Sequence, residues 1–112
     1  MSKAPVADRQ SLELLVASLP EEVQGQLRMG SMFGWPAAYV GKKLAFCVKD
    51  DKVGIKVSED VATQLINSGT AIPFRPYGKP PMREWVEMTI SGDVSRMIPV
   101  LTASVDFLAN TN

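Results

Sequence analysis

Residues 32–57 constrain the fold most, because apolar and polar side chains alternate along them with a period of two. Successive side chains of a β-strand point to opposite faces, so this alternation predicts strands with one apolar face. Two polar breaks, at residues 40–43 and 49–52, have the length of hairpin turns. The stretch therefore predicts three antiparallel strands. The side chains expected on the apolar face are Leu44, Phe46, Val48, Val53, Ile55 and Val57.

Helical periodicity precedes and follows this meander. A helix over residues 10–19 is predicted by apolar side chains spaced i, i+3, i+4 and i+7, which are Leu12, Leu15, Val16 and Leu19. Pro20 suits the start of a second short turn, because proline is tolerated at the first helical position. A helix over residues 59–68 is predicted between Ser58, a suitable N-cap, and Gly69, a suitable stop.

The C-terminal third predicts two more strands and a last helix. Residues 71–74 and 84–90 have strand character, and the intervening residues 75–83 form a loop because they are rich in proline and glycine. Asp93 can cap a final helix whose apolar stripe ends at Leu108. Pro99 falls inside that stripe and predicts a kink or a delayed start, because proline removes a backbone hydrogen bond.

These elements predict an α+β fold with a roughly five-stranded, mainly antiparallel sheet. We expect the first and last helices to cover its apolar face, with Leu12, Leu15, Leu101 and Val105 in the core, and one helix between the third and fourth strands. A chain of 112 residues has the length of one domain. We therefore expect a single domain over residues 1–112, with residues 1–8 as a frayed tail.

The charge and composition limit the classes of binding partner and the cellular compartment that we expect. Twelve basic and twelve acidic residues cancel, so tight non-specific binding to duplex DNA is not expected. No apolar run approaches the roughly 20 residues that span a bilayer, and the N-terminus lacks the apolar core of a signal peptide. A single cysteine cannot form an internal disulfide, which favours a reducing cytoplasm.

The inventory of reactive side chains is short. The chain has no histidine and one cysteine, so neither imidazole catalysis nor a zinc site is predicted, and no cofactor is expected. Cys47 is interpreted as a buried inert thiol, the alternative being a redox-active one. The acidic neighbours at residues 21–22, 50–51 and 59–60 suit helix starts and a turn, the alternative being a metal or acid–base pair.

Two groups of side chains are candidates for binding. The first is a cationic loop with one aromatic ring, which comprises Arg75, Tyr77, Lys79 and Arg83. These side chains suit binding to phosphate, nucleic acid or an acidic protein surface, and the alternative is a solvated hairpin loop without a ligand. The second is a set of methionine and aromatic side chains, comprising Met29, Met32, Phe33, Trp35, Met82 and Trp85. Such side chains occur at adaptable binding surfaces, and the alternative is ordinary core packing.

The order of several short motifs resembles the N-terminal domain of the TfoX/Sxy family of bacterial proteins. The motifs are Met32-Phe33-Gly34, a Gly-Lys turn, Leu44-Ala45-Phe46, Val53-Gly54-Ile55-Lys56-Val57, Pro73-Phe74, and the run from Tyr77 to Glu87 with its glycine loop, Met82 and Trp85. The resemblance extends over residues 12–108. No single motif is specific, but the ordered set is.

The resemblance implies a regulatory rather than a catalytic role. The best-studied relatives promote natural competence and are thought to act as transcriptional co-regulators beside the cyclic-AMP receptor protein. Those relatives carry a second, helical domain after this one, and we expect the present chain to be a stand-alone member. The family supplies no agreed catalytic or ligand residues.

Two classes of function remain open at this point. The first is a non-catalytic regulatory or protein-interaction module; the second is a domain that binds a small molecule or phosphate through residues 32–34 and 75–83. The candidate interaction residues are Met32, Phe33, Gly34, Trp35, Arg75, Tyr77, Lys79, Arg83 and Trp85. We also expect a homodimer formed through Trp35 or Trp85, with residues 84–90 at a sheet edge as a second route.

Overall fold

The computed structural model describes residues 6–32, 34–75, 82–90 and 94–110, and every structural statement below concerns these residues. Its helices are α1 (Val6–Ala17), α2 (Glu21–Gln24), α3 (Glu59–Asn67) and α4 (Ile98–Ala109), with a short 3-10 helix η2 (Val94–Arg96) before α4. Its strands are β1 (Arg28–Met32), β2 (Trp35–Val40), β3 (Lys43–Lys49), β4 (Lys52–Lys56), β5 (Ile72–Pro73) and β6 (Trp85–Thr89). The predicted α+β fold is confirmed.

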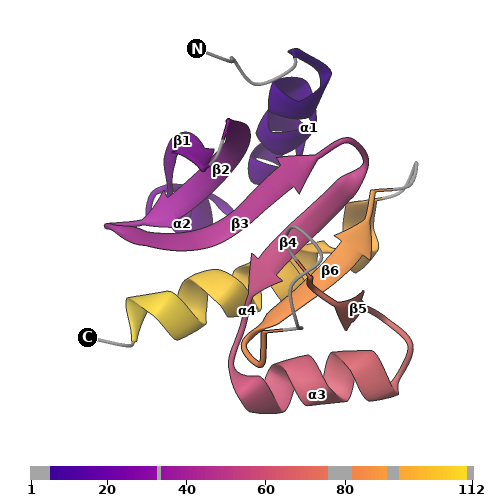
Figure 1. The fold of residues 1–112 in the computed structure, drawn as a ribbon. Helices are drawn as coiled ribbons and strands as arrows, with labels where there is room; N and C mark the ends of the chain where they lie inside the picture. Colours follow the sequence, from indigo (N-terminus) through magenta and orange to yellow (C-terminus); the bar gives the residue numbers. More distant parts are fainter. Residues whose placement is uncertain (1–5, 33, 76–81, 91–93, 111–112) are drawn as a thin grey trace.

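The strands form one antiparallel sheet in the order β1-β2-β3-β4-β6-β5 (Figure 1). The described sheet thus has six strands instead of five. The additional strand is β1, whose side chains are exposed except for the partly buried Met32. An edge strand needs no buried apolar face, and residues 28–31 therefore lack the alternation by which the other strands could be predicted.

The helices lie on one face of the sheet, and Figure 1 looks onto the other face. Helix α1 packs on β2 and β3, α4 packs behind β3 and β4, and α3 lies against β5 and β6. The core between the layers confirms the predicted apolar face: Phe46, Val48, Val53, Ile55 and Val57 are each 0% exposed, and Leu12, Leu15, Leu101 and Val105 are buried with them.

Leu44 corrects this prediction, because it is partly buried and packs on the opposite face of the sheet. The register shifts between Ala38, which pairs with Phe46, and Tyr39, which pairs with Leu44. Ala45 is the extra residue of this β-bulge, and a bulge reverses the inside–outside phase of the residues beyond it. The buried Ser104 hydroxyl of α4 donates a hydrogen bond to the Ala45 carbonyl at 3.2 Å, which holds the bulge against the helix.

Most of the predicted capping, glycine and proline residues lie at helix ends. Ser58 caps α3 by accepting a hydrogen bond from the Val61 N–H at 3.2 Å, and Gly69 follows its end with φ of 77°. Pro99 lies in the first turn of α4, which is the predicted delayed start, and Pro20 precedes α2. Helix α1 begins at Val6 rather than at residue 10. Asp8 lies in its first turn, where a negative charge interacts favourably with the positive end of the helix dipole.

Strand β6 is not at an edge of the sheet, which corrects the second predicted route to a dimer. It pairs with β4 on one side and β5 on the other, so the edges are β1 and β5. At the β1 edge, the Ser31 carbonyl already accepts a hydrogen bond from the Tyr39 hydroxyl at 2.7 Å. Among the described helices, none has the length and the apolar character that crossing a membrane requires.

Candidate functional site

The face of the sheet opposite the helices, here called the open face, has a row of small residues across its middle. The register pairs Gly30 with Ala37, Ala37 with Cys47, and Cys47 with Gly54, so four neighbouring strands contribute one small residue each. Larger side chains stand on both sides of this row. The row is therefore a shallow trough that runs perpendicular to the strands.

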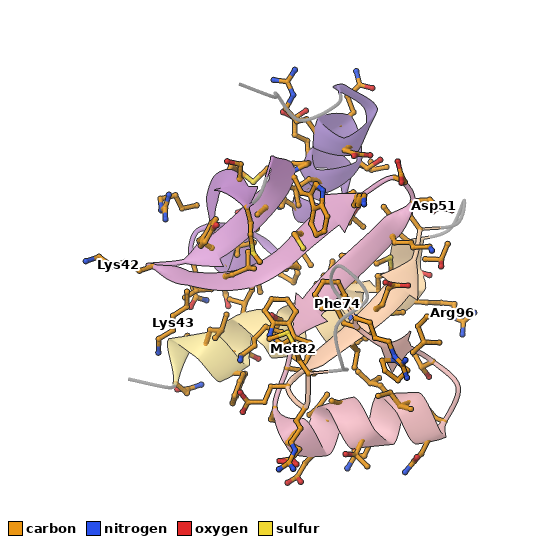
Figure 2. All side chains as sticks on the ribbon, in the orientation of Figure 1. Lys42, Lys43, Asp51, Phe74, Met82 and Arg96 are labelled. Carbon is orange, nitrogen blue, oxygen red and sulfur yellow. The ribbon has the colours of Figure 1, made fainter. Side chains whose placement is uncertain are left out.

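Aromatic rings close onto the trough at its two glycines. A methyl group added at Gly54 would lie 2.7 Å from Cε1 of Phe74, so the Phe74 ring rests directly on the backbone of β4 (Figure 2). Phe74 also packs on Trp85, with the ring centroids 5.4 Å apart. At the other end, a methyl group at Gly30 would lie 3.2 Å from Cε1 of Tyr39. A side chain at Gly54 would therefore displace the Phe74 ring, whereas at Gly30 a small shift of the Tyr39 ring would make room for a methyl group.

Cations stand over three of the aromatic rings on this face. The Arg28 guanidinium carbon lies 4.9 Å from the Tyr39 centroid, and the Lys49 ammonium nitrogen lies 4.9 Å from the Trp35 centroid. The Lys56 ammonium lies 5.7 Å from the centroid of Trp85 and forms an ion pair with Glu84 at 2.9 Å. A cation is attracted to the negative face of a ring, so these contacts hold positive charge above an aromatic surface.

A cavity of about 200 Å³ lies in the trough, above Cys47 and Gly54. Trp35 and Phe74 contribute aromatic surface to its lining. Its charged lining consists of the cations Lys49, Lys52 and Arg75 and the acids Asp50 and Glu87. Lys49 and Lys52 are directly opposite each other where β3 and β4 meet at their hairpin.

The two layers of the domain carry opposite charge, although the whole chain has none. Residues 28–56, which form β1 to β4 and their hairpins, include six basic and two acidic residues. The four α-helices include one basic residue, Arg9, and seven acidic residues. The net charge of zero therefore hides a positive sheet and a negative helical layer, and the formal charge at the open face favours anions.

Cys47 forms part of the cavity floor, and its thiol is buried. It is 2% exposed, and burial raises the pKa of its thiol to about 11, against a smaller lowering by a hydrogen bond from the Gly54 backbone. At neutral pH the sulfur is therefore a protonated thiol, and the thiolate is the nucleophilic form. The predicted burial of Cys47 is confirmed, and its inertness stays a prediction.

The structure brings part of the predicted site together. Trp35 and Arg75 line the same cavity, and Met32 packs beside Trp35 on the open face. Trp85 also belongs to this face, but it is 7% exposed and is mostly a packing residue. Arg83 is exposed and lies away from this cavity, near Lys56 and Glu59.

The remaining predicted residues are distributed as follows. Gly34 lies in the turn between β1 and β2 with φ of 82°, a backbone conformation that suits glycine. Met29 and Met82 are exposed, at 45% and 46%. Phe33, Tyr77 and Lys79 lie outside the described residues.

Sequence reasoning missed Lys49, Lys52 and Phe74 as members of the site. The signal for the two lysines was present, because Lys49 shares the phase of Cys47, and Lys52 shares the phase of Gly54. Nothing local predicts that Phe74 covers Gly54, since β5 reaches β4 only by way of β6.

The acidic neighbours have the structural positions that were expected. Glu21 and Glu22 are in the first turn of α2, and Glu59 and Asp60 are in the first turn of α3. Asp50 has φ of 58° in the hairpin between β3 and β4. In the part of the chain that the structure describes, no three His, Cys, Asp or Glu side chains gather closely enough to hold a metal ion.

Comparison of the chain with family models, with curated proteins and with solved structures finds no match. The function is therefore inferred from the residues of the open face.

Proposed function

We propose that this chain is a non-catalytic regulatory or interaction module that receives its partner on the open face of the sheet. The observation that carries the proposal is the difference between the two faces. The helical face is occupied by the core, whereas the open face has the partly exposed Trp35 and Tyr39 among cations. Aromatic and arginine side chains are enriched at protein interfaces and supply most hot spots of binding energy.

The shape of the open face supports contact with a surface or with part of a larger ligand. Its cavity of about 200 Å³ is smaller than the roughly 300–1,000 Å³ of cavities that enclose drug-sized ligands. The sequence contains no histidine, and the single thiol is protonated at neutral pH. A binding role uses the groups that this face does present, which are aromatic rings and fixed cations.

The role and location that we propose follow the resemblance of the motifs to the TfoX/Sxy N-terminal domain. In that interpretation the chain acts as a transcriptional co-regulator or as a related interaction module in the bacterial cytoplasm. The ordered motifs carry this part of the proposal. The unpaired thiol of Cys47 suits a reducing compartment.

A second candidate function is the binding of a small molecule or phosphate. It is favoured by one observation, the convergence of Arg75, Lys49 and Lys52 on a cavity with aromatic walls. The sequence predicted this function for residues 32–34 and 75–83. Of the described residues in these two ranges, Arg75 lines the cavity. The other two cations, Lys49 and Lys52, come from β3 and β4.

Self-association stays a prediction, and the structure narrows it to Trp35. Trp85 is 7% exposed, so its side chain offers little surface to a second copy. Dimerisation through Trp35 would be resistant to salt and would weaken in Trp35→Ala. Sedimentation across micromolar concentrations measures it, and a monomer throughout would reject it.

The proposed function is tested by affinity capture from a lysate of the source cell, with and without nuclease. Trp35→Glu places a charge on the open face, and Leu14→Glu places the same charge on α1, where Leu14 is 58% exposed. Trp35→Glu should remove the captured partner, and Leu14→Glu should retain it. Loss of the partner in Leu14→Glu alone would move the binding surface to the helices and would reject the proposal.

A further inference from the structure

We propose that the open face binds a nucleoside phosphate, with the base in the cavity above Cys47, beside Phe74, and the phosphate on Lys49, Lys52 and Arg75. The ligand is either a free nucleotide or one unit of a single-stranded nucleic acid, which share this chemistry. The inference rests on the proposed function, because it assigns a chemical class to the partner of the open face.

The floor and walls of the cavity suit a flat aromatic group. Cys47 is small, so the floor is low beside the Phe74 ring, which itself covers Gly54. Trp35 and Phe74 supply aromatic surface in the lining. Stacking of a base on an aromatic side chain is favourable and tolerates any base, since every base has a π-face.

The cations of the cavity suit a phosphate attached to that base. Lys49 and Lys52 face each other across the β3–β4 hairpin, where like charges repel, and an anion bound between them would reduce this repulsion. Lys49 is at the same time 4.9 Å from the Trp35 centroid. Positive charge and aromatic surface are therefore adjacent, as a ligand that carries both a base and a phosphate requires.

Glu87 distinguishes this ligand from a simple anion. Its carboxylate lines the cavity and lies opposite Gly54 in the register of β4 and β6. A carboxylate repels phosphate and the side chains of an acidic peptide, but it accepts hydrogen bonds from the exocyclic amino group of a base. A ligand with negative charge at one end and amino donors at the other satisfies both sets of groups.

Duplex DNA does not present this ligand. In a duplex the base faces are stacked on one another, so they are not available to aromatic rings on the surface of a sheet. The separation of charge between the layers also turns the acidic helices away from the nucleic acid. Single strands and free nucleotides expose both the base face and the phosphate.

The test measures binding of fluorescein-labelled oligodeoxyadenylate and of adenosine monophosphate by anisotropy and competition, across salt concentrations. Three phosphate-contacting cations predict that log affinity falls with log salt with a slope of about −2 for the single strand. Oligodeoxyadenylate should bind about fivefold or more tightly than oligodeoxythymidylate, because thymine has no exocyclic amino group. Glu87→Ala should remove this difference.

A matched pair of variants separates the cavity from general surface charge. Lys52 and Lys42 are both exposed and both stand in hairpins, but Lys42 is at the opposite end of the sheet from this cavity (Figure 2). Lys52→Gln should lower affinity several-fold and reduce the slope by about 0.7, whereas Lys42→Gln should change neither. Trp35→Leu keeps an apolar side chain and should weaken binding about tenfold by loss of stacking.

The outcomes assign the source or overturn the inference. If adenosine monophosphate binds as tightly as the single strand or more tightly, the ligand is a free nucleotide. If the single strand binds more tightly than the monophosphate, the ligand is a single-stranded nucleic acid. Absence of binding to both, equal losses in the two lysine variants, or equal affinity for polyglutamate or for the duplex of the same sequence would overturn it. The proposed function then still stands if Trp35→Glu removes the captured partner, which keeps the two failures distinguishable.

Discussion

The two faces of the sheet use alternate residues of the same strands for different purposes. In β3, Phe46 and Val48 point into the helical core and are 0% exposed, while Lys49 projects from the other face over an aromatic ring. The helical face is apolar and continuous. The open face combines small residues, rings and cations, a composition that packing alone does not require. The larger apolar cluster lies under the helices, whereas the buried cluster of the open face is smaller and is surrounded by cations.

The largest expected effect is on the helical face. Phe46→Ala should lower the free energy of unfolding by about 3–5 kcal/mol, because it leaves a cavity in the tightly packed core. Leu44→Ala is the matched variant of the same strand on the open face, where Leu44 is partly exposed, and should cost about 1–2 kcal/mol. Urea denaturation measures both values. Equal losses would mean that the two faces contribute alike.

A smaller effect is expected where the open face is packed. Gly54→Ala should cost about 1–3 kcal/mol, because the new methyl group meets the Phe74 ring at 2.7 Å. Gly25→Ala is the control, since its methyl group would lie 3.6 Å from the nearest atom, in the αR conformation that alanine favours. Phe74→Leu should relieve part of the Gly54→Ala cost. Full additivity of the two substitutions would contradict the contact.

A third effect is a loss of stability at alkaline pH through Cys47. Burial raises the pKa of this thiol to about 11 in the folded protein, above the ordinary value of 9.0 for an exposed thiol. The folded state therefore holds the proton more tightly, so this contribution is complete below pH 9 and is lost as the pH rises towards 11. Each pH unit in that window should cost about 1.4 kcal/mol or less.

Thermal unfolding of the protein and of Cys47→Ala, each compared at pH 8.5 and pH 10.5, checks this effect. The protein should lose more stability than Cys47→Ala over this interval. An identical loss in both would show that Cys47 does not titrate differently in the folded and unfolded states.

The sequence predicted the helical face well because local periodicity encodes it. The alternation from Phe46 to Val57 and the stripe from Leu12 to Leu19 each need only short-range information. The face predicted for Leu44 was wrong, because the bulge at Ala45 depends on how β2 and β3 pair. Such a shift in register leaves no trace in the pattern of one strand.

The open face was harder to predict because its contacts are distant in sequence. Trp35 and Arg75 were chosen from composition and do meet at one cavity. Phe74 was read as the end of a strand, yet it covers Gly54, which is twenty positions earlier. The charge difference between the layers also emerged only once the chain was folded, because the net charge of the whole sequence is zero.

Backbone amide chemical shifts during titration with oligodeoxyadenylate report most directly which face receives a ligand. We expect the largest changes at Trp35, Cys47, Lys49 and Lys52, around the cavity of the open face, with little change in α1 and α4. Shifts concentrated in the helices, or none at saturating oligonucleotide, would contradict the assignment of the open face as the site that binds a nucleoside phosphate.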